Sequence, residues 1–180
     1  VYHEQGLGDD IQFCRYLPYI KALGGKVILS TRASLIPLLS SAFGADQIIE
    51  HSVDMLEHLN FDWAAPIQSL PHLCGTTLDS VPNQTPFLSV QPAYRDKWRT
   101  LLAPHCLKDN IRKIGFVWTC NPLDKLGQVR SCPLQLIEPL LTVPGTQWFS
   151  VQKGPAVADL QHIAANHPNL VDLSSHINDF

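Results

Sequence analysis

The chain has 180 residues, of which 45% are hydrophobic and 16% are charged, a composition typical of a globular protein with a sizeable core. Its formal net charge of -3 comes from 13 basic and 16 acidic residues, and the basic residues are scattered along the sequence. No basic cluster therefore predicts binding to nucleic acid or to an anionic membrane.

The five cysteines form no C-x-x-C pair and none of the spacings typical of zinc sites or disulfide-rich domains. No stretch approaches the roughly 18 apolar residues of a membrane span, and the first residues lack the pattern of a signal peptide. These features predict a protein of the reducing cytoplasm that has no membrane span.

Helices and strands alternate in the first part of the sequence. Apolar residues recur every three positions over 11–20, which predicts a helix at 9–23 that Pro18 kinks and Gly24 ends. Val1-Tyr2 resemble the end of a strand. The following apolar runs predict a strand at 26–30, a helix at 33–42, and strands at 47–50 and 61–65. This alternation predicts a parallel, wound sheet.

A second α/β unit is predicted after a stretch rich in Pro, Gly, Thr and Asn. The sequence predicts a helix at 92–102, a linker at 103–113, strands at 114–118, 147–151 and 169–173, and helices at 134–142 and 156–165. We therefore expect two domains, at 1–105 and 106–180. Because a sheet usually has about four to six strands, three strands predict an incomplete second domain and a chain that is a fragment.

The turn at 3–9, HEQGLGD, joins a strand end to a helix start, where wound α/β sheets bind ligands. It is not a dinucleotide fingerprint, because the third glycine is missing and two carboxylates stand where a phosphate would approach the helix. Two interpretations of Asp9 stay open from the pattern alone. Its carboxylate complements the helix dipole, or it takes a proton from an acceptor hydroxyl. His3 is typical of a hydrogen-bonded structural histidine.

Five motifs occur in order along the chain and together resemble a known family. They are HEQGLGDDIQFCRYLP at 3–18, LPHLCGTTLDSVP at 70–82, GFVWTCNP at 115–122, RSCPL at 130–134 and SVQKGP at 150–155. This series resembles the glycosyltransferase-like region that follows tetratricopeptide repeats in many bacterial proteins. That region is similar to heptosyltransferases (glycosyltransferase family 9) and to protein O-linked N-acetylglucosamine transferases.

The resemblance implies the GT-B architecture, in which two Rossmann-like domains face a cleft. The acceptor would bind mainly to the first domain and a nucleotide-sugar to the second, truncated one. In heptosyltransferases the aspartate of the matching Gly-Asp pair is regarded as the catalytic base, so the resemblance gives this role to Asp9. The other acceptor-side loop residues are Glu4, Gln5, Gly6 and Gly8.

The resemblance also implies a donor-phosphate site. Arg130 precedes a predicted helix, and Lys153 lies between a predicted strand and helix, where a cation could stabilise a departing nucleotide diphosphate. For each, the alternative is a solvated surface cation. Asn121 and Ser131 also match the family motif. The chain departs from that motif at its Gly, His and Asn-Asp positions, and it lacks the D-T-x-x-x-H segment that closes on the nucleotide in relatives.

The expected reaction is a metal-independent, inverting transfer of a sugar from a nucleotide-sugar to a hydroxyl of a sugar, lipid or protein acceptor. No D-x-D triplet indicates a metal-bridged diphosphate, and no cofactor is expected. The alternative is a degenerate, non-catalytic binding or scaffold module attached to tetratricopeptide repeats, which the departures from the motif favour.

Overall fold

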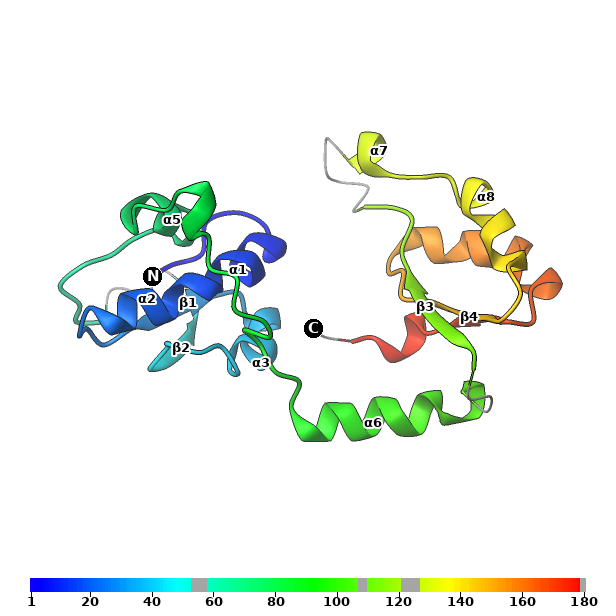
Figure 1. The fold of residues 1–180 in the computed structure, drawn as a ribbon, viewed down its shortest axis with the longest axis horizontal. Helices are drawn as coiled ribbons and strands as arrows, with labels where there is room; N and C mark the ends of the chain where they lie inside the picture. The colour runs from blue at the N-terminus through cyan, green and yellow to red at the C-terminus, as the bar shows by residue number, and fades with distance from the viewer. Residues whose placement is uncertain (53–57, 107–109, 121–126, 179–180) are drawn as a thin grey trace. The chain divides into compact units, whose positions relative to one another are not determined.

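The computed structural model describes residues 1–52, 58–106, 110–120 and 127–178. The described chain divides into two compact units, 1–95 and 96–178, and the boundary lies within helix α6 (Pro92–Leu102). Both units combine helices with a parallel sheet, which confirms the predicted α/β class (Figure 1). The GT-B arrangement of the two units, and their acceptor and donor roles, remain predictions.

The sheet of the first unit is built around strand β1 (Ile28–Thr31), which pairs in parallel with β2 (Gln47–Glu50). On the other side of β1, Tyr2 forms parallel bridges with both Ser30 and Pro66. Strand β2 has the predicted bounds, and β1 lies within two residues of its predicted start. Tyr2 thus lies between two parallel extended segments, which agrees with the expectation that Val1-Tyr2 end a strand.

The predicted strand at 61–65 is wrong. Its residues lie outside both sheets, and Trp63 is 91% exposed. Pro66, directly after it, forms the bridge to Tyr2 instead, and the backbone oxygen of Ala65 accepts a hydrogen bond from the Tyr2 N–H at 3.0 Å. An aromatic and apolar run forms a strand only where neighbouring segments pair with it and cover it, and here the run faces solvent.

The predicted first helix is divided into three parts. Helix α1 (Leu7–Phe13) is followed by a 3-10 turn at Cys14–Tyr16 and by α2 (Leu17–Ala22). The change occurs directly before Pro18, which has no N–H to bond the carbonyl of residue 14 and whose ring disfavours a continuous α-helix. Gly24 follows α2 with φ of 94°, a left-handed conformation that ends the helix.

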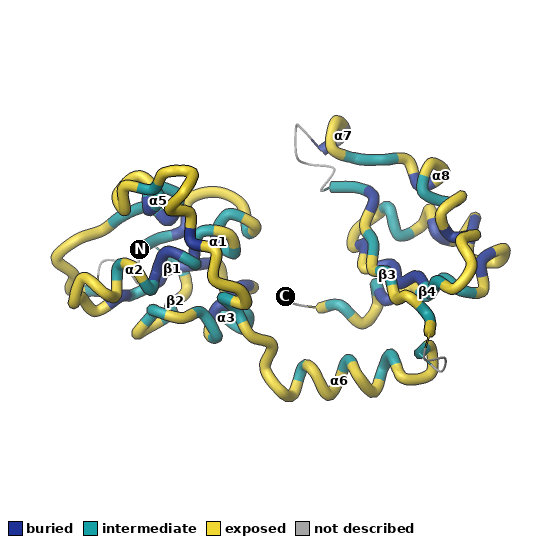
Figure 2. Tube along the Cα trace, viewed as in Figure 1, coloured by how far each residue is buried: buried dark blue, intermediate teal, exposed yellow. Residues whose placement is uncertain are grey.

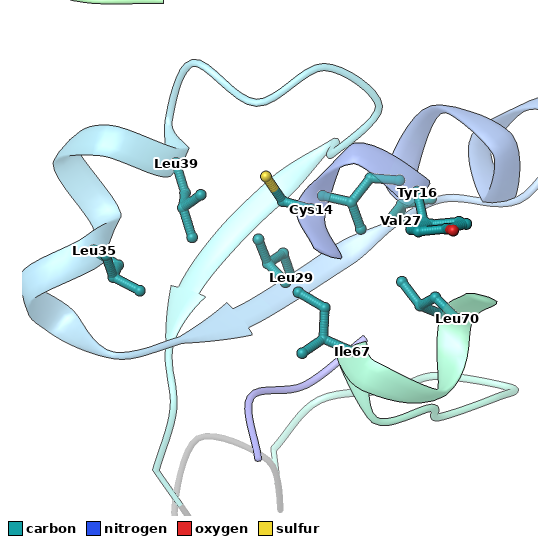
Figure 3. Close-up of a cluster of buried hydrophobic side chains, with 9 residues drawn as sticks. Cys14, Tyr16, Val27, Leu29, Leu35, Leu39, Ile67 and Leu70 are labelled. Atoms are coloured by element: carbon teal, nitrogen blue, oxygen red, sulfur yellow. The ribbon is translucent and has the colours of Figure 1, made fainter. Parts of the chain in front are cut away.

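The remaining helices of the first unit are short. Its other elements are the 3-10 turn Ala33–Leu35, α3 (Ile36–Leu39), the 3-10 turn Ile67–Ser69, α5 (Leu70–Leu73) and the 3-10 turn Leu78–Ser80. The predicted helix at 33–42 is therefore shorter than expected. Figure 3 shows side chains from β1, α3 and the segment 67–70 converging around Leu29, which is fully buried. The core consists of Cys14, Tyr16, Leu17, Val27, Leu29, Leu35, Leu39, Ile67 and Leu70.

The second unit has a three-stranded parallel sheet in the order β3-β4-β5. The strands are β3 (Arg112–Phe116), β4 (Thr146–Ser150) and β5 (Leu170–Asp172). The predicted strand at 114–118 is shifted by two residues, because the chain leaves the sheet after Phe116. All three predicted strands exist and are parallel.

Short helical segments connect these strands. They are the 3-10 turn Ala103–His105, α7 (Gly127–Arg130), α8 (Leu134–Ile137), and 3-10 segments at Glu138–Thr142, Pro155–His162, Ala164–Asn166 and Ser174–His176. The predicted helix at 156–165 thus forms 3-10 turns. The core consists of Trp118, Leu134, Leu141, Trp148, Leu160 and Ile163. Helix α6 contributes no buried residue, as Figure 2 shows.

Candidate functional site

Asp9 lies in the first turn of α1 and caps the start of that helix. Its Oδ2 accepts a hydrogen bond from the Gly6 N–H at 2.8 Å, and the Asp9 N–H donates to the Gly6 oxygen at 3.1 Å. The Asp9 side chain is half-buried, and its Oδ1 makes no hydrogen bond to a described residue. One oxygen therefore satisfies the helix end, while the other is available to accept a proton.

The loop before Asp9 is tied to neighbouring elements. Glu4 Oε1 accepts a hydrogen bond from the Gln68 N–H at 3.1 Å, and the Gln5 oxygen accepts one from Arg32 Nη2 at 2.8 Å. A Cβ on Gly6 would lie 3.0 Å from Asp9 Oδ2, whereas a Cβ on Gly8 would meet nothing within 4 Å. A side chain at position 6 would therefore crowd the Asp9 carboxylate, whereas Gly8 has open space around it.

Asp10, the neighbour of Asp9, has a different environment because its side chain is fully buried. Its Oδ1 and Oδ2 lie 2.9 and 3.0 Å from His3 Nδ1, and the Thr31 hydroxyl donates to Oδ2. Sequence reasoning missed this network. A signal was present, since Asp10 precedes the buried Cys14 and Leu17 by four and seven residues and so shares their helix face.

Hydrogen bonds fix the tautomer of the His3 ring. Arg32 Nε donates to His3 Nε2 at 2.8 Å, so Nε2 carries the lone pair and Nδ1–H donates to Asp10. The expected structural role of His3 agrees with this arrangement. One polar network therefore joins the first residues of the sequence, α1 and the end of β1. Its hydrogen bonds run from Thr31 to Asp10, on to His3 and then to Arg32.

The second unit contains an open pocket of about 430 Å³. The described residues that line it are Trp118, Thr119, Cys120, Gly127, Ser131, Cys132, Pro133, Ala156 and Asp159. Residues 118–120 follow β3, and Ala156 and Asp159 belong to the 3-10 helix after β4. The pocket therefore lies at the carboxyl ends of parallel strands, the usual ligand position in such sheets.

Two polar side chains hold the pocket wall together. Ser131 Oγ lies 2.9 Å from Thr119 Oγ1 and accepts a hydrogen bond from the Cys120 N–H at 3.2 Å. Gln152 is 5% exposed, and its Oε1 accepts hydrogen bonds from the N–H groups of Trp118 and Thr119, both at 3.1 Å. Gln152 thereby links the loops after β3 and β4. Sequence reasoning did not single it out.

The other predicted donor residues have different positions. Lys153 Nζ donates to the Ser174 oxygen at 2.8 Å, and Arg130 is exposed in α7. The described lining of the pocket includes Ser131 but neither Arg130 nor Lys153. Asn121 lies outside the described residues. The charged side chain in the described lining is Asp159, whose Oδ2 accepts a hydrogen bond from Trp118 Nε1 at 3.3 Å.

The described residues contain no group of three or more His, Cys, Asp or Glu side chains placed to hold a metal ion. Within the same ranges, no helix combines the length and the apolar character needed to cross a membrane.

Among curated proteins, the chain is similar to Protein FlbA of Caulobacter vibrioides, with 27% identity over 198 residues. The alignment covers 98% of this chain and 33% of FlbA, so the chain spans about a third of the length of FlbA. No family model and no solved structure matches the chain.

Proposed function

We propose that the chain is part of a metal-independent, inverting glycosyltransferase with a GT-B arrangement, and that the pocket of the second unit binds the nucleotide-sugar donor. The observation that supports this most is the position of the pocket at the carboxyl ends of β3 and β4. Ser131, from the family-like RSCPL motif, lies in the pocket wall. Arg130 and Lys153 would stabilise the leaving nucleotide from the loops beside it.

In this proposal Asp9 is the general base that takes the proton from the acceptor hydroxyl. One oxygen of its half-buried carboxylate accepts a hydrogen bond from the Gly6 N–H, and the other makes no hydrogen bond to the described residues. Loop 4–8 would border the acceptor, whether a sugar, lipid or protein. The five cysteines, all described and all free thiols, support a cytoplasmic location, and tetratricopeptide repeats remain an expected neighbour.

Binding of a panel of nucleotides and nucleotide-sugars, measured by calorimetry, tests the donor pocket. Ala156→Trp places an indole in the pocket, whereas Ala158→Trp changes an exposed residue of the same 3-10 helix. We expect Ala156→Trp to abolish binding and Ala158→Trp to preserve it, with circular dichroism verifying that both variants fold. Equal binding by both variants would contradict the donor role of this pocket.

Sugar transfer by the full-length protein tests the role of Asp9. Asp9→Asn keeps an oxygen that can accept from the Gly6 N–H but cannot act as a base, whereas Asp9→Ala removes both functions. We expect both variants to lose turnover, by about a hundredfold or more. If Asp9→Asn retains turnover and Asp9→Ala alone loses it, Asp9 acts only as a helix cap.

The second candidate function is a non-catalytic binding or scaffold module. It is favoured by the described pocket lining, which carries the Asp159 carboxylate and no cation, and by Lys153, which is bound to the Ser174 oxygen. A folded full-length protein that binds no nucleotide or nucleotide-sugar of the panel would support this function over transfer.

A further inference from the structure

Basic side chains gather at the carboxyl edge of the sheet in the first unit. Arg32 follows β1, His51 follows β2, and His3 follows the Tyr2 bridge. The His51 N–H donates to the Thr31 oxygen at 2.7 Å, and the His3 N–H donates to the Ser30 oxygen at 2.9 Å. These hydrogen bonds place the three residues side by side on neighbouring extended segments, at the edge where parallel sheets bind ligands.

The Arg32 guanidinium is held by neutral partners. Nε donates to His3 Nε2 and Nη2 donates to the Gln5 oxygen, both at 2.8 Å. Within the described ranges, Arg32 forms no ion pair with a carboxylate, although its side chain is exposed. Two hydrogen bonds therefore fix the orientation of this cation and leave Nη1 without a hydrogen bond to the described residues.

Three carboxylates of the 3–10 segment, those of Glu4, Asp9 and Asp10, are engaged elsewhere. Asp10 is buried behind His3, which separates it from Arg32. Asp9 caps α1 through the Gly6 N–H, and Glu4 accepts from the Gln68 N–H. Each of these three acids thus has a partner other than the guanidinium.

His51 adds a second polar group beside Arg32. Its Nδ1 lies 3.0 Å from Ser30 Oγ, and its ring packs edge-on against His3 with a centroid separation of 5.9 Å. When the Ser30 hydroxyl donates to Nδ1, the proton of the neutral ring is on Nε2, which then serves as a donor. A guanidinium and an imidazole N–H on adjacent strand ends suit an oxyanion.

We infer that Arg32, oriented by His3 and assisted by His51, forms a binding site for the carboxylate or phosphate group of a ligand. The planar guanidinium offers parallel N–H donors that match the oxygens of either group. The residues of this site belong to the first unit, whereas those that line the donor pocket belong to the second. The inference does not rest on the proposed sugar transfer.

Titration of the chain with sodium phosphate and, separately, sodium acetate tests the site, with sodium chloride at matched ionic strength as the control for screening. The Arg32 Nε–Hε and His51 ring signals are followed by NMR. We expect saturable shifts in the wild type with phosphate, acetate or both. The anion that binds more tightly identifies a phosphate-bearing or a carboxylate-bearing ligand.

Arg32→Gln removes the guanidinium, and Arg99→Gln removes the same charge from α6, where Arg99 is exposed and pairs with Asp96 at 2.9 Å. We expect Arg32→Gln to weaken anion binding by at least about tenfold and Arg99→Gln to leave it unchanged. Arg32→Lys keeps the charge without the planar fork and should give intermediate binding. Wild-type shifts no larger than those in chloride, or equal affinities of folded Arg32→Gln and wild type, would overturn the inference. If Arg32→Gln fails to fold, the test is the wild-type Arg32 Nε–Hε signal alone, compared between phosphate or acetate and chloride.

Discussion

The buried amide of Gln152 provides the sharpest test of how the pocket is held together. Its Oε1 accepts from the N–H groups of Trp118 and Thr119, and its Nε2 donates to the oxygens of Thr119 and Lys153 at 3.2 and 2.8 Å. Gln152→Leu keeps a side chain of similar size but leaves two backbone N–H groups without an acceptor. An unsatisfied buried polar group costs about 1–3 kcal/mol. Because Thr119 is only half-buried, we expect a total loss of about 2–4 kcal/mol of unfolding free energy.

Urea unfolding followed by tryptophan fluorescence measures this loss. Trp118 and Trp148 are 4% and 6% exposed, so their emission reports on the second unit. Gln135→Leu, at an exposed position of α8, is the matched control and should change the unfolding free energy by less than about 0.5 kcal/mol. A Gln152→Leu protein that is as stable as this control would refute the role assigned to the amide.

Three further predictions concern the first unit. Gly44→Ala should cost about 3 kcal/mol or more, because φ is 89° and a Cβ would clash with the backbone of Leu17 and Pro18. The hydrogen bond from Lys21, and to a smaller extent that from the Val27 N–H, lowers the pKa of Asp46. Asp46→Asn should therefore be less stable than the wild type above about pH 4, and this difference should disappear as the pH falls through the folded-state pKa of Asp46. Burial raises the pKa of the Cys14 thiol to about 12, so iodoacetamide at pH 8 should not modify it in the folded protein.

Each of these has its own control. Gly24→Ala, with φ of 94° and nothing within 4 Å of a Cβ, should cost only about 1 kcal/mol in urea unfolding, and equal losses at both glycines would exclude a clash. For Asp46, pH-dependent unfolding curves of wild type and variant that stay parallel down to about pH 2 would contradict the linkage. Modification of Cys14 as fast as in urea, read by mass spectrometry, would show that this thiol is accessible.

The sequence predicted the strands better than it predicted the helices. Strand β2 could be located because QIIE lies between turn signals and Ile49 is buried. The run at 61–65, FDWAA, is also largely apolar, yet the structure exposes Trp63 and forms its bridge one residue later, at Pro66. Composition alone does not show which apolar run will find a partner strand.

The candidate sites could be predicted only in part. The turn at 3–9 was recognised because a strand end meets a glycine-rich helix start. Which of the adjacent acids faces the core depends on the phase of α1, and Asp10 rather than Asp9 shares the face of Cys14 and Leu17. Gln152 contacts residues more than thirty positions earlier, and such pairing follows from the parallel order of β3 and β4.

The parallel bridges of Tyr2 have a consequence for protein engineering. Residues near the beginning of a sequence are commonly trimmed or fused to tags because chain ends tend to be loosely held. Tyr2 lies between β1 and Pro66. Its own N–H and oxygen bond the Ala65 oxygen and the Ile67 N–H, and on the other side the Val1 oxygen and the His3 N–H bond the backbone of Ser30. Removing the first three residues would split the middle of the sheet and uncouple the segment 65–67 from β1, so any truncated or tagged variant should keep residues 1–3 in place.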